Sequence, residues 1–154
     1  MSRKWKITLG VLAVLIVFCL WYTRPRSFGE LAGSGEVTFI SMIAMESDPP
    51  NGISAWEMDS DGSRMEEVIE ILESSKYRAS LIDLIPFLPG PDATKQVNIV
   101  VTQDGDGFFW INCWGSAADF HFDDKKAVYH LNGSVTEELF AYTQEFGDKL
   151  ENKT

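Results

Sequence analysis

Residues 97–114, VNIVVTQDGDGFFWINCW, predict the centre of the fold. Two runs rich in β-branched and aromatic residues flank the tetrapeptide DGDG at 104–107, whose residue types favour a tight hairpin turn. Apolar residues occupy both sets of alternate positions, so both faces of the hairpin are apolar. We therefore predict two antiparallel strands, 97–102 and 108–114, in the middle of a sheet.

The predicted four-residue turn also assigns the side chains of this hairpin to faces. One face would carry Phe108, Trp110 and Trp114 beside Val97, Ile99 and Val101, and the other Phe109, Ile111 and Cys113 beside Val100. Helices can cover only one face, so the other must be covered by residues 79–91 or a partner, or remain an apolar patch. Phe108, Trp110 and Trp114 are therefore candidate residues for binding a sugar or a protein, with core packing as the alternative.

Further strands and two amphipathic helices are predicted around the central hairpin. The strand letters fall at 36–46, 53–58, 119–122 and 126–131. One helix would begin with the capping box Ser63 to Glu66, run to about Lys76 and bury Met65, Val68, Ile69 and Leu72. The last helix would begin with the capping box Ser134 to Glu137 and bury Val135, Leu139, Tyr142, Thr143, Phe146 and Leu150. The expected fold is α+β, a mainly antiparallel sheet with both helices on one face.

An uncharged stretch, residues 7–22, precedes this domain and reads ITLGVLAVLIVFCLWY. As a helix it would be about 24 Å long, near the short end for crossing a bilayer. Small residues that a signal peptidase needs do not follow it, so an uncleaved anchor is favoured over a cleaved signal peptide. We predict a basic stub at 1–6, a transmembrane helix (a signal anchor) at 7–23, a linker at 24–35 and one globular domain at 36–151.

The charge is distributed unevenly along the chain. Residues 27–154 contain all 23 acidic residues and eight of the 13 basic ones, a net charge of −15 against −10 for the whole chain. Such a domain is not suited to binding nucleic acid, because phosphates must be neutralised by Lys and Arg. The acidic surface fits simple solubility, a cation or a basic partner. The basic residues before the apolar helix slightly favour a single-pass protein with its C-terminal domain outside the cytoplasm.

The last hairpin contains both histidines of the chain and suggests a metal site. Pairing residue 122 with 127 would place Asp119, His121 and His130 on one face, with Asp119 directly opposite His130. His and Asp side chains at this spacing could bind zinc or act as an acid–base pair. A solvated polar strand face is the favoured explanation, because no fourth ligand can be identified. Asp119 and the two histidines form the candidate metal set.

Two other features have limited chemical content. The stretch EMDSDG at 57–62 resembles half of a calcium-binding EF-hand loop, but Val68 stands where that loop needs a glutamate. Cys19 lies in the apolar N-terminal stretch and Cys113 in the globular domain, so we predict no disulfide between them. No hydrolase, phosphate-loop or zinc-protease motif occurs, so an enzyme is disfavoured and no cofactor is expected.

The organisation of basic stub, apolar helix, short linker and small acidic domain resembles that of small uncharacterised exported or membrane-anchored proteins of Gram-positive bacteria. This resemblance covers the whole chain and implies no activity. We expect a cell-membrane protein, bound to the membrane through residues 7–23, that acts as a binding module for a protein or carbohydrate of the cell envelope. A metal-dependent hydrolase using Asp119, His121 and His130, or an acidic inhibitor of the immunity-protein type, is the alternative.

Overall fold

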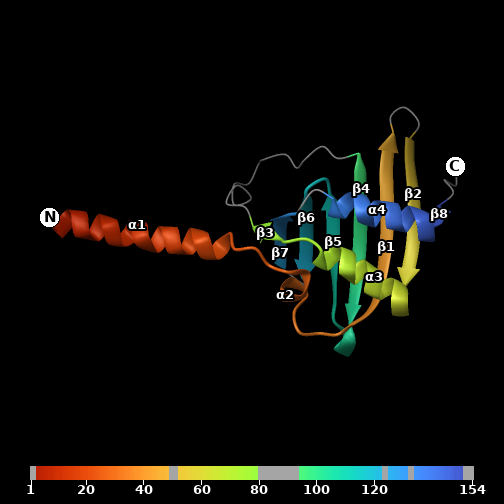
Figure 1. Cartoon of the computed structure of the whole chain (residues 1–154), viewed down its shortest axis with the longest axis horizontal. Helices are drawn as coiled ribbons and strands as arrows, with labels where there is room; N and C mark the ends of the chain where they lie inside the picture. Colours follow the sequence, from red (N-terminus) through yellow and green to blue (C-terminus); the bar gives the residue numbers. More distant parts are fainter. Residues whose placement is uncertain (1–2, 49–51, 80–93, 123–124, 132–133, 151–154) are drawn as a thin grey trace.

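A single antiparallel sheet with its helices follows the long N-terminal helix (Figure 1). The computed structural model describes residues 3–48, 52–79, 94–122, 125–131 and 134–150. The strands are β1 (Val37–Asp48), β2 (Gly52–Ser60), β3 (Arg78–Ala79), β4 (Lys95–Gln103), β5 (Phe108–Trp114), β6 (Ala117–Phe122), β7 (Lys125–His130) and β8 (Asp148–Leu150). The helices are α1 (Arg3–Tyr22), α2 (Phe28–Ala32), α3 (Gly62–Glu73) and α4 (Val135–Phe146). The predicted α+β class is confirmed.

The predicted central hairpin occupies the middle of the sheet. Its strand order is β3-β7-β6-β5-β4-β1-β2-β8, which places β4 and β5 fourth and fifth from either edge. Neighbouring strands pair in antiparallel fashion throughout. The two short edge strands, β3 and β8, were not predicted, because two or three residues carry no readable alternation.

The predicted faces of the central hairpin were wrong by one residue. The Gln103 amide donates to the Gly107 carbonyl oxygen at 2.7 Å, so the loop contains three residues, 104–106, instead of four. Gly105 makes this loop possible, because its φ of 72° lies in the left-handed region. As a result Val97, Ile99 and Val101 pair with Cys113, Ile111 and Phe109, while Val100 pairs with Trp110. A shift of one residue exchanges the two faces of a strand.

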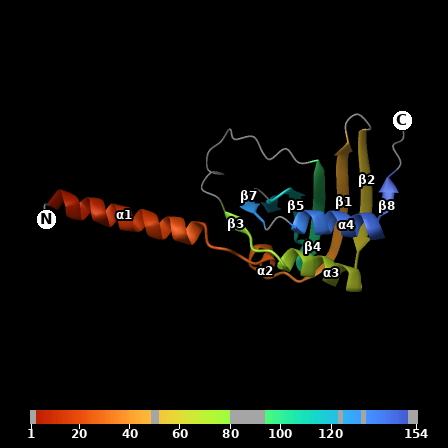
Figure 2. The same cartoon turned by 45° about the horizontal axis from the view of Figure 1, so that its top comes forward.

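The core lies on the face that carries these β-branched residues. One row of buried side chains crosses five strands and consists of Met58, Met42, Ile99, Ile111 and Phe120. Helix α4 packs against β4, β1 and β2, and α3 packs against α4 (Figures 1 and 2). Val68 and Leu72 of α3 and Leu139 of α4 belong to the same buried cluster. The apolar periodicity therefore identified part of each buried side, with Val68 and Leu72 in α3 and Leu139 in α4. It was wrong at the end of the last helix, because Phe146 is 41% exposed and Leu150 lies in β8 with 40% of its surface exposed.

The predicted capping boxes at the starts of these helices do not form. Helix α3 begins at Gly62, so Ser63 already lies inside it, and α3 has no side-chain cap at Asp61. Ser134 precedes α4 without making a side-chain cap bond, and Glu137 instead binds Lys95 Nζ at 2.8 Å. Both motifs are present in the sequence, but α3 begins before its serine, and the glutamate of α4 forms an ion pair with a lysine instead of bonding the backbone.

The predicted linker at 24–35 is part of the folded body. Helix α2 lies within it and has a true capping box, in which Ser27 and Glu30 bond each other's backbone amides. Phe28 is buried in the core with 2% of its surface exposed. Before it, Arg26 and Tyr77 exchange two backbone hydrogen bonds of 2.9 Å. The folded domain thus begins about ten residues earlier than predicted.

Helix α1 extends away from the domain as a separate rod. Its segment Lys4–Tyr22 is long and apolar enough to cross a membrane, and none of it is buried against the rest of the protein. A signal sequence near the N-terminus has the same length and composition.

Replacing Phe28 with Ala should destabilise the domain by about 3–5 kcal/mol, because a buried ring would be lost and a cavity left. The measurement is the free energy of unfolding of the full chain in detergent micelles. Phe108→Ala is the matched control, since that ring is 55% exposed, and it should cost under about 1 kcal/mol. Equal losses from the two variants would mean that residues 24–35 are a linker.

Gly147→Ala should also destabilise the domain, by about 1–3 kcal/mol. A Cβ at Gly147 would lie 2.5 Å from the Thr143 carbonyl oxygen and 2.7 Å from that of Glu57, two backbone atoms that cannot rotate away. A Cβ at Gly107 would approach nothing closer than 3.7 Å, so Gly107→Ala is the control and should be nearly neutral. Denaturant midpoints of both variants make the test, and a neutral Gly147→Ala would contradict this packing.

Candidate functional site

The face of the sheet opposite the core carries the strongest candidate site. Its residues alternate with the buried ones on β4, β5 and β6, and we call this set the outer face: Gln96, Asn98, Val100, Phe108, Trp110, Asn112, Trp114, Asp119 and His121. All three predicted binding residues, Phe108, Trp110 and Trp114, lie on it. The shift of the central register separates them from the valines and isoleucine with which they were expected to pack.

Aromatic rings form a continuous stack across the outer face. Phe108 and Trp110 have ring centroids 6.1 Å apart with planes inclined by 22°. Trp110 stacks in the same way on His121 of the neighbouring strand, at 5.1 Å and 22°. Phe108 and Val100, at this end of the stack, are 55% and 43% exposed. This end of the stack therefore exposes apolar surface.

Polar side chains form the next row across the same strands. Asn98 pairs with Asn112, and Asn112 with Asp119, so three hydrogen-bonding groups follow one another on β4, β5 and β6. Gln96 donates from Nε2 to Asn98 Oδ1 at 2.9 Å. Trp114 occupies the row beyond them, about 13 Å from Trp110 by the spacing of an extended strand. The outer face thus consists of a polar row between two aromatic ones.

Asp119 is the most buried polar group of this row. Only 4% of the residue is exposed. Its Oδ2 accepts from Lys126 Nζ at 2.6 Å and lies 3.2 Å from His121 Nε2. Its Oδ1 is buried and has no hydrogen-bond partner within the described part of the chain. A buried carboxylate oxygen without a donor is costly, so this atom would gain from a ligand hydroxyl or amide.

The predicted metal set is only partly brought together. The register of β6 and β7 differs by two residues from the predicted one, so Asp119 lies opposite Val128 and His130 lies opposite Ala117. The faces are unchanged by an even shift, but His130 lies about 13 Å along the sheet from His121. In the described ranges, no group of three His, Cys, Asp or Glu side chains is placed to hold a metal. Phe120 pairs with Ala127 across this hairpin, which keeps the large ring opposite a small side chain.

Cys113 lies on the core face and is fully buried. Burial raises the pKa of its thiol from 9.0 to about 12, so it is protonated at neutral pH. A buried, protonated thiol on the far side of the sheet from Trp110 is a packing group and not a nucleophile.

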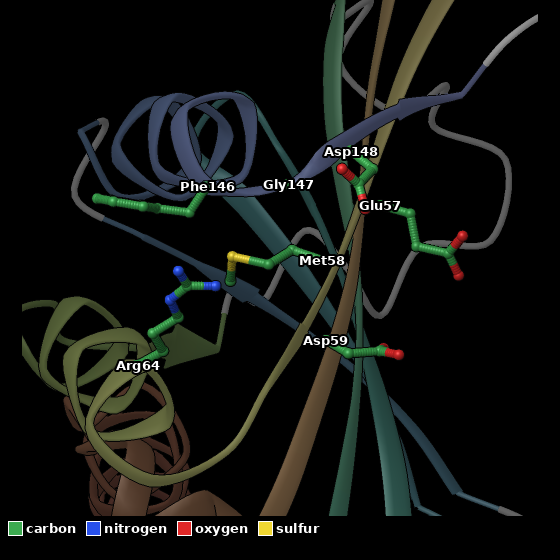
Figure 3. Close-up of a pocket in the computed structure, with 7 residues that line it drawn as sticks. All are labelled: Glu57, Met58, Asp59, Arg64, Phe146, Gly147 and Asp148. Atoms are coloured by element: carbon green, nitrogen blue, oxygen red, sulfur yellow. The ribbon is translucent and has the colours of Figure 1, made fainter.

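A second hollow lies between β2, α3 and the end of α4 (Figure 3). It includes part of the EF-hand-like stretch, Glu57 and Asp59. Arg64 points from α3 toward Met58 and Phe146, whereas the carboxylates of Glu57 and Asp59 point away on the other side of β2 (Figure 3). The guanidinium of Arg64 lies 5.5 Å from the centroid of the Phe146 ring. A calcium site requires several carboxylates that converge on one point, and the acidic groups of this hollow do not converge.

Comparison with known proteins gives no relative: no family model, curated protein or solved structure matches this chain. The site must therefore be interpreted from its own geometry. Sequence reasoning found its aromatic residues and Asp119 but missed the polar residues Gln96, Asn98 and Asn112 on the same face. Their alternation with buried residues was the available signal, and the assumed four-residue turn concealed it.

The buried thiol of Cys113 should make the domain sensitive to alkali. Because its pKa is higher in the folded than in the unfolded chain, its contribution is fully present below pH 9.0 and is lost as the pH rises toward about 12. Cys113→Ala should reduce the fall in unfolding free energy over this range by up to about 1.4 kcal/mol per pH unit. Cys19→Ala, in α1, is the control and should leave the slope unchanged.

Proposed function

We propose that this chain is a single-pass, membrane-anchored binding module without enzymatic activity, whose outer face binds a carbohydrate of the cell envelope. The observation that carries the proposal is the polar row between Trp110 and Trp114. Apolar C–H faces of a sugar ring pack on indole and phenyl rings, while its hydroxyls need both donors and acceptors. Amide and carboxylate side chains supply both in the row between the two tryptophans.

The orphan oxygen of Asp119 supports a hydroxyl-rich ligand. Asp119 Oδ1 is buried without a partner in the described chain, and Asn112 lies beside it on the next strand. A sugar hydroxyl could donate to the carboxylate and accept from an amide at the same time. His121 and Lys126 hold the other carboxylate oxygen, so Asp119 is oriented before a ligand arrives.

Ligand binding at the outer face also requires that the helices pack on the opposite face of the sheet. Helix α4 packs against β4, β1 and β2, and α3 packs against α4. We infer that both cover the core face, so neither of them covers the outer face. Residues 79–91 were predicted as another possible cover, and 80–91 lie outside the described residues. A protein ligand would use the same aromatic stack, and the experiment below distinguishes it from a glycan.

Anchoring through α1 completes the proposal. Helix α1 has the length and composition of a membrane span. Residues 20–26, at the end of the apolar run, read LWYTRPR and lack the small residues that a cleavage site needs there. We propose that the domain faces the outside of the cytoplasm, where envelope glycans occur. The test is a C-terminal tag on intact cells, which external protease should remove while the membrane retains residues 1–26.

Trp110→Ala should weaken glycan binding at least about tenfold, since it removes the central ring of the stack. The full chain in detergent micelles would be applied to arrays of peptidoglycan fragments, glucans and mannans. Trp110→Phe should restore most of the affinity, and Phe146→Ala, near the far edge of the sheet, should not change it. Circular dichroism must show that each variant is folded.

Two results would contradict the proposal. One is a folded Trp110→Ala variant that binds the same glycans as the wild type. The other is that no array glycan binds, while a deglycosylated envelope protein does so through Trp110.

A further inference from the structure

The membrane-proximal edge of the domain is held close to the end of α1. Helix α1 ends at Tyr22, and Arg26 is already paired with Tyr77 in the domain. Three residues, 23–25, therefore join the helix to the sheet, a reach of roughly 14 Å at full extension. Strands β3 and β7 are the strands nearest the end of α1 in both views (Figures 1 and 2).

A cavity of about 480 Å³ lies at this junction. Trp21 and Tyr22 line it from the end of α1, Arg26 from the connecting segment, and Lys126 and Val128 from β7. Among the described residues that line it, the two charged ones, Arg26 and Lys126, are both cations. Aromatic rings at a helix end favour the headgroup level of a bilayer, so the cavity would open where lipid headgroups lie.

Three more basic residues are close neighbours of the paired residues Arg26 and Tyr77, although the chain as a whole is acidic. Arg24, Lys76 and Arg78 are exposed near Arg26, in a chain of net charge −10. Glu30 partly balances Arg24 at 3.7 Å, and Asp119 balances Lys126 at 2.6 Å. Within the residues that the structure describes, no acidic side chain forms an ion pair with Arg26, and its buried Nε makes no hydrogen bond.

We propose that this cavity binds the phosphate headgroup of an anionic phospholipid. Arg26 would donate from its guanidinium to the phosphate oxygens, and Lys126 would add a second positive charge. Trp21 and Val128 would contact the glycerol and the upper part of the acyl chains. The inference rests on the proposed anchoring by α1, because only then does the cavity lie at a leaflet surface.

Such a lipid would fix the orientation of the domain as well as its distance from the membrane. A three-residue connection limits distance but allows rotation, whereas a bound headgroup on β7 holds the β3 edge against the bilayer. The outer face would then have a fixed orientation relative to the membrane surface.

Native mass spectrometry of the full chain tests the proposal. The protein would be extracted from vesicles containing equal amounts of phosphatidylcholine and phosphatidylglycerol, and the retained lipid identified. We expect the wild type to retain phosphatidylglycerol preferentially. Arg26→Gln and Lys126→Gln should each lower this preference about fivefold, the effect of one basic residue near an anionic surface. Arg26→Lys should keep most of it.

A matched control uses two cations remote from the cavity, Arg64→Gln and Lys149→Gln, which should leave the lipid preference unchanged. Flotation with pure phosphatidylcholine vesicles tests the anchor separately, because α1 should insert whatever the lipid charge. A chain that floats but retains both lipids equally would overturn the cavity proposal and leave the anchor intact. Equal losses in the control pair, or Arg26-dependent binding of inorganic phosphate without a lipid preference, would also overturn it. A chain that does not float would refute the anchor.

Discussion

The hydrogen bond from Gln103 to the Gly107 carbonyl oxygen decides which side chains of the central hairpin are buried. It closes a three-residue loop and aligns the β-branched residues of β4 with Ile111 and its neighbours on β5. The folded segment after α2 reinforces this turn. Gln103 Nε2 donates to the carbonyl oxygens of Ala32 and Gly35, and the Glu36 amide donates to Asp104 Oδ1. The turn, the start of the domain and the choice of faces are therefore one coupled arrangement.

Residue alternation was sufficient to predict the strands but not their relative alignment. The sequence predicted strands at 97–102 and 108–114, and the ends of the observed strands lie within two residues of these bounds. Which face each side chain occupies depended on whether the loop holds three or four residues, and both lengths are common in hairpins. The same limit applied to β6 and β7, where a two-residue shift kept the faces but moved His130 away from Asp119. The local sequence determines the alternation of side chains along each strand, whereas contacts across the turn determine the register between the strands.

The helices show a related limit. Much of their buried sides followed from apolar spacing, because packing against the sheet uses the period of the helix directly. The spacing failed at Phe146 and Leu150, which are exposed where α4 ends and β8 follows. The first residues of the helices did not follow from the capping motif, because a serine and a glutamate three residues apart have other possible partners. Glu137 binds Lys95 across the helix–sheet interface, while the motif at Ser27 and Glu30, within a presumed linker, forms completely. A short motif predicts a helix start only where no partner from elsewhere competes.

Lys126 connects the outer face with the cavity at the end of α1. Its ammonium lies 2.6 Å from Asp119 Oδ2 on the outer face and also lines the cavity beside Trp21. Asp119 is nearly buried, so water screens its interactions with Lys126 and His121 poorly. An anion in the cavity would compete with Asp119 for Lys126 and would alter the carboxylate that faces the polar row. The electrostatics of the outer face therefore cannot be separated from what occupies the edge next to α1.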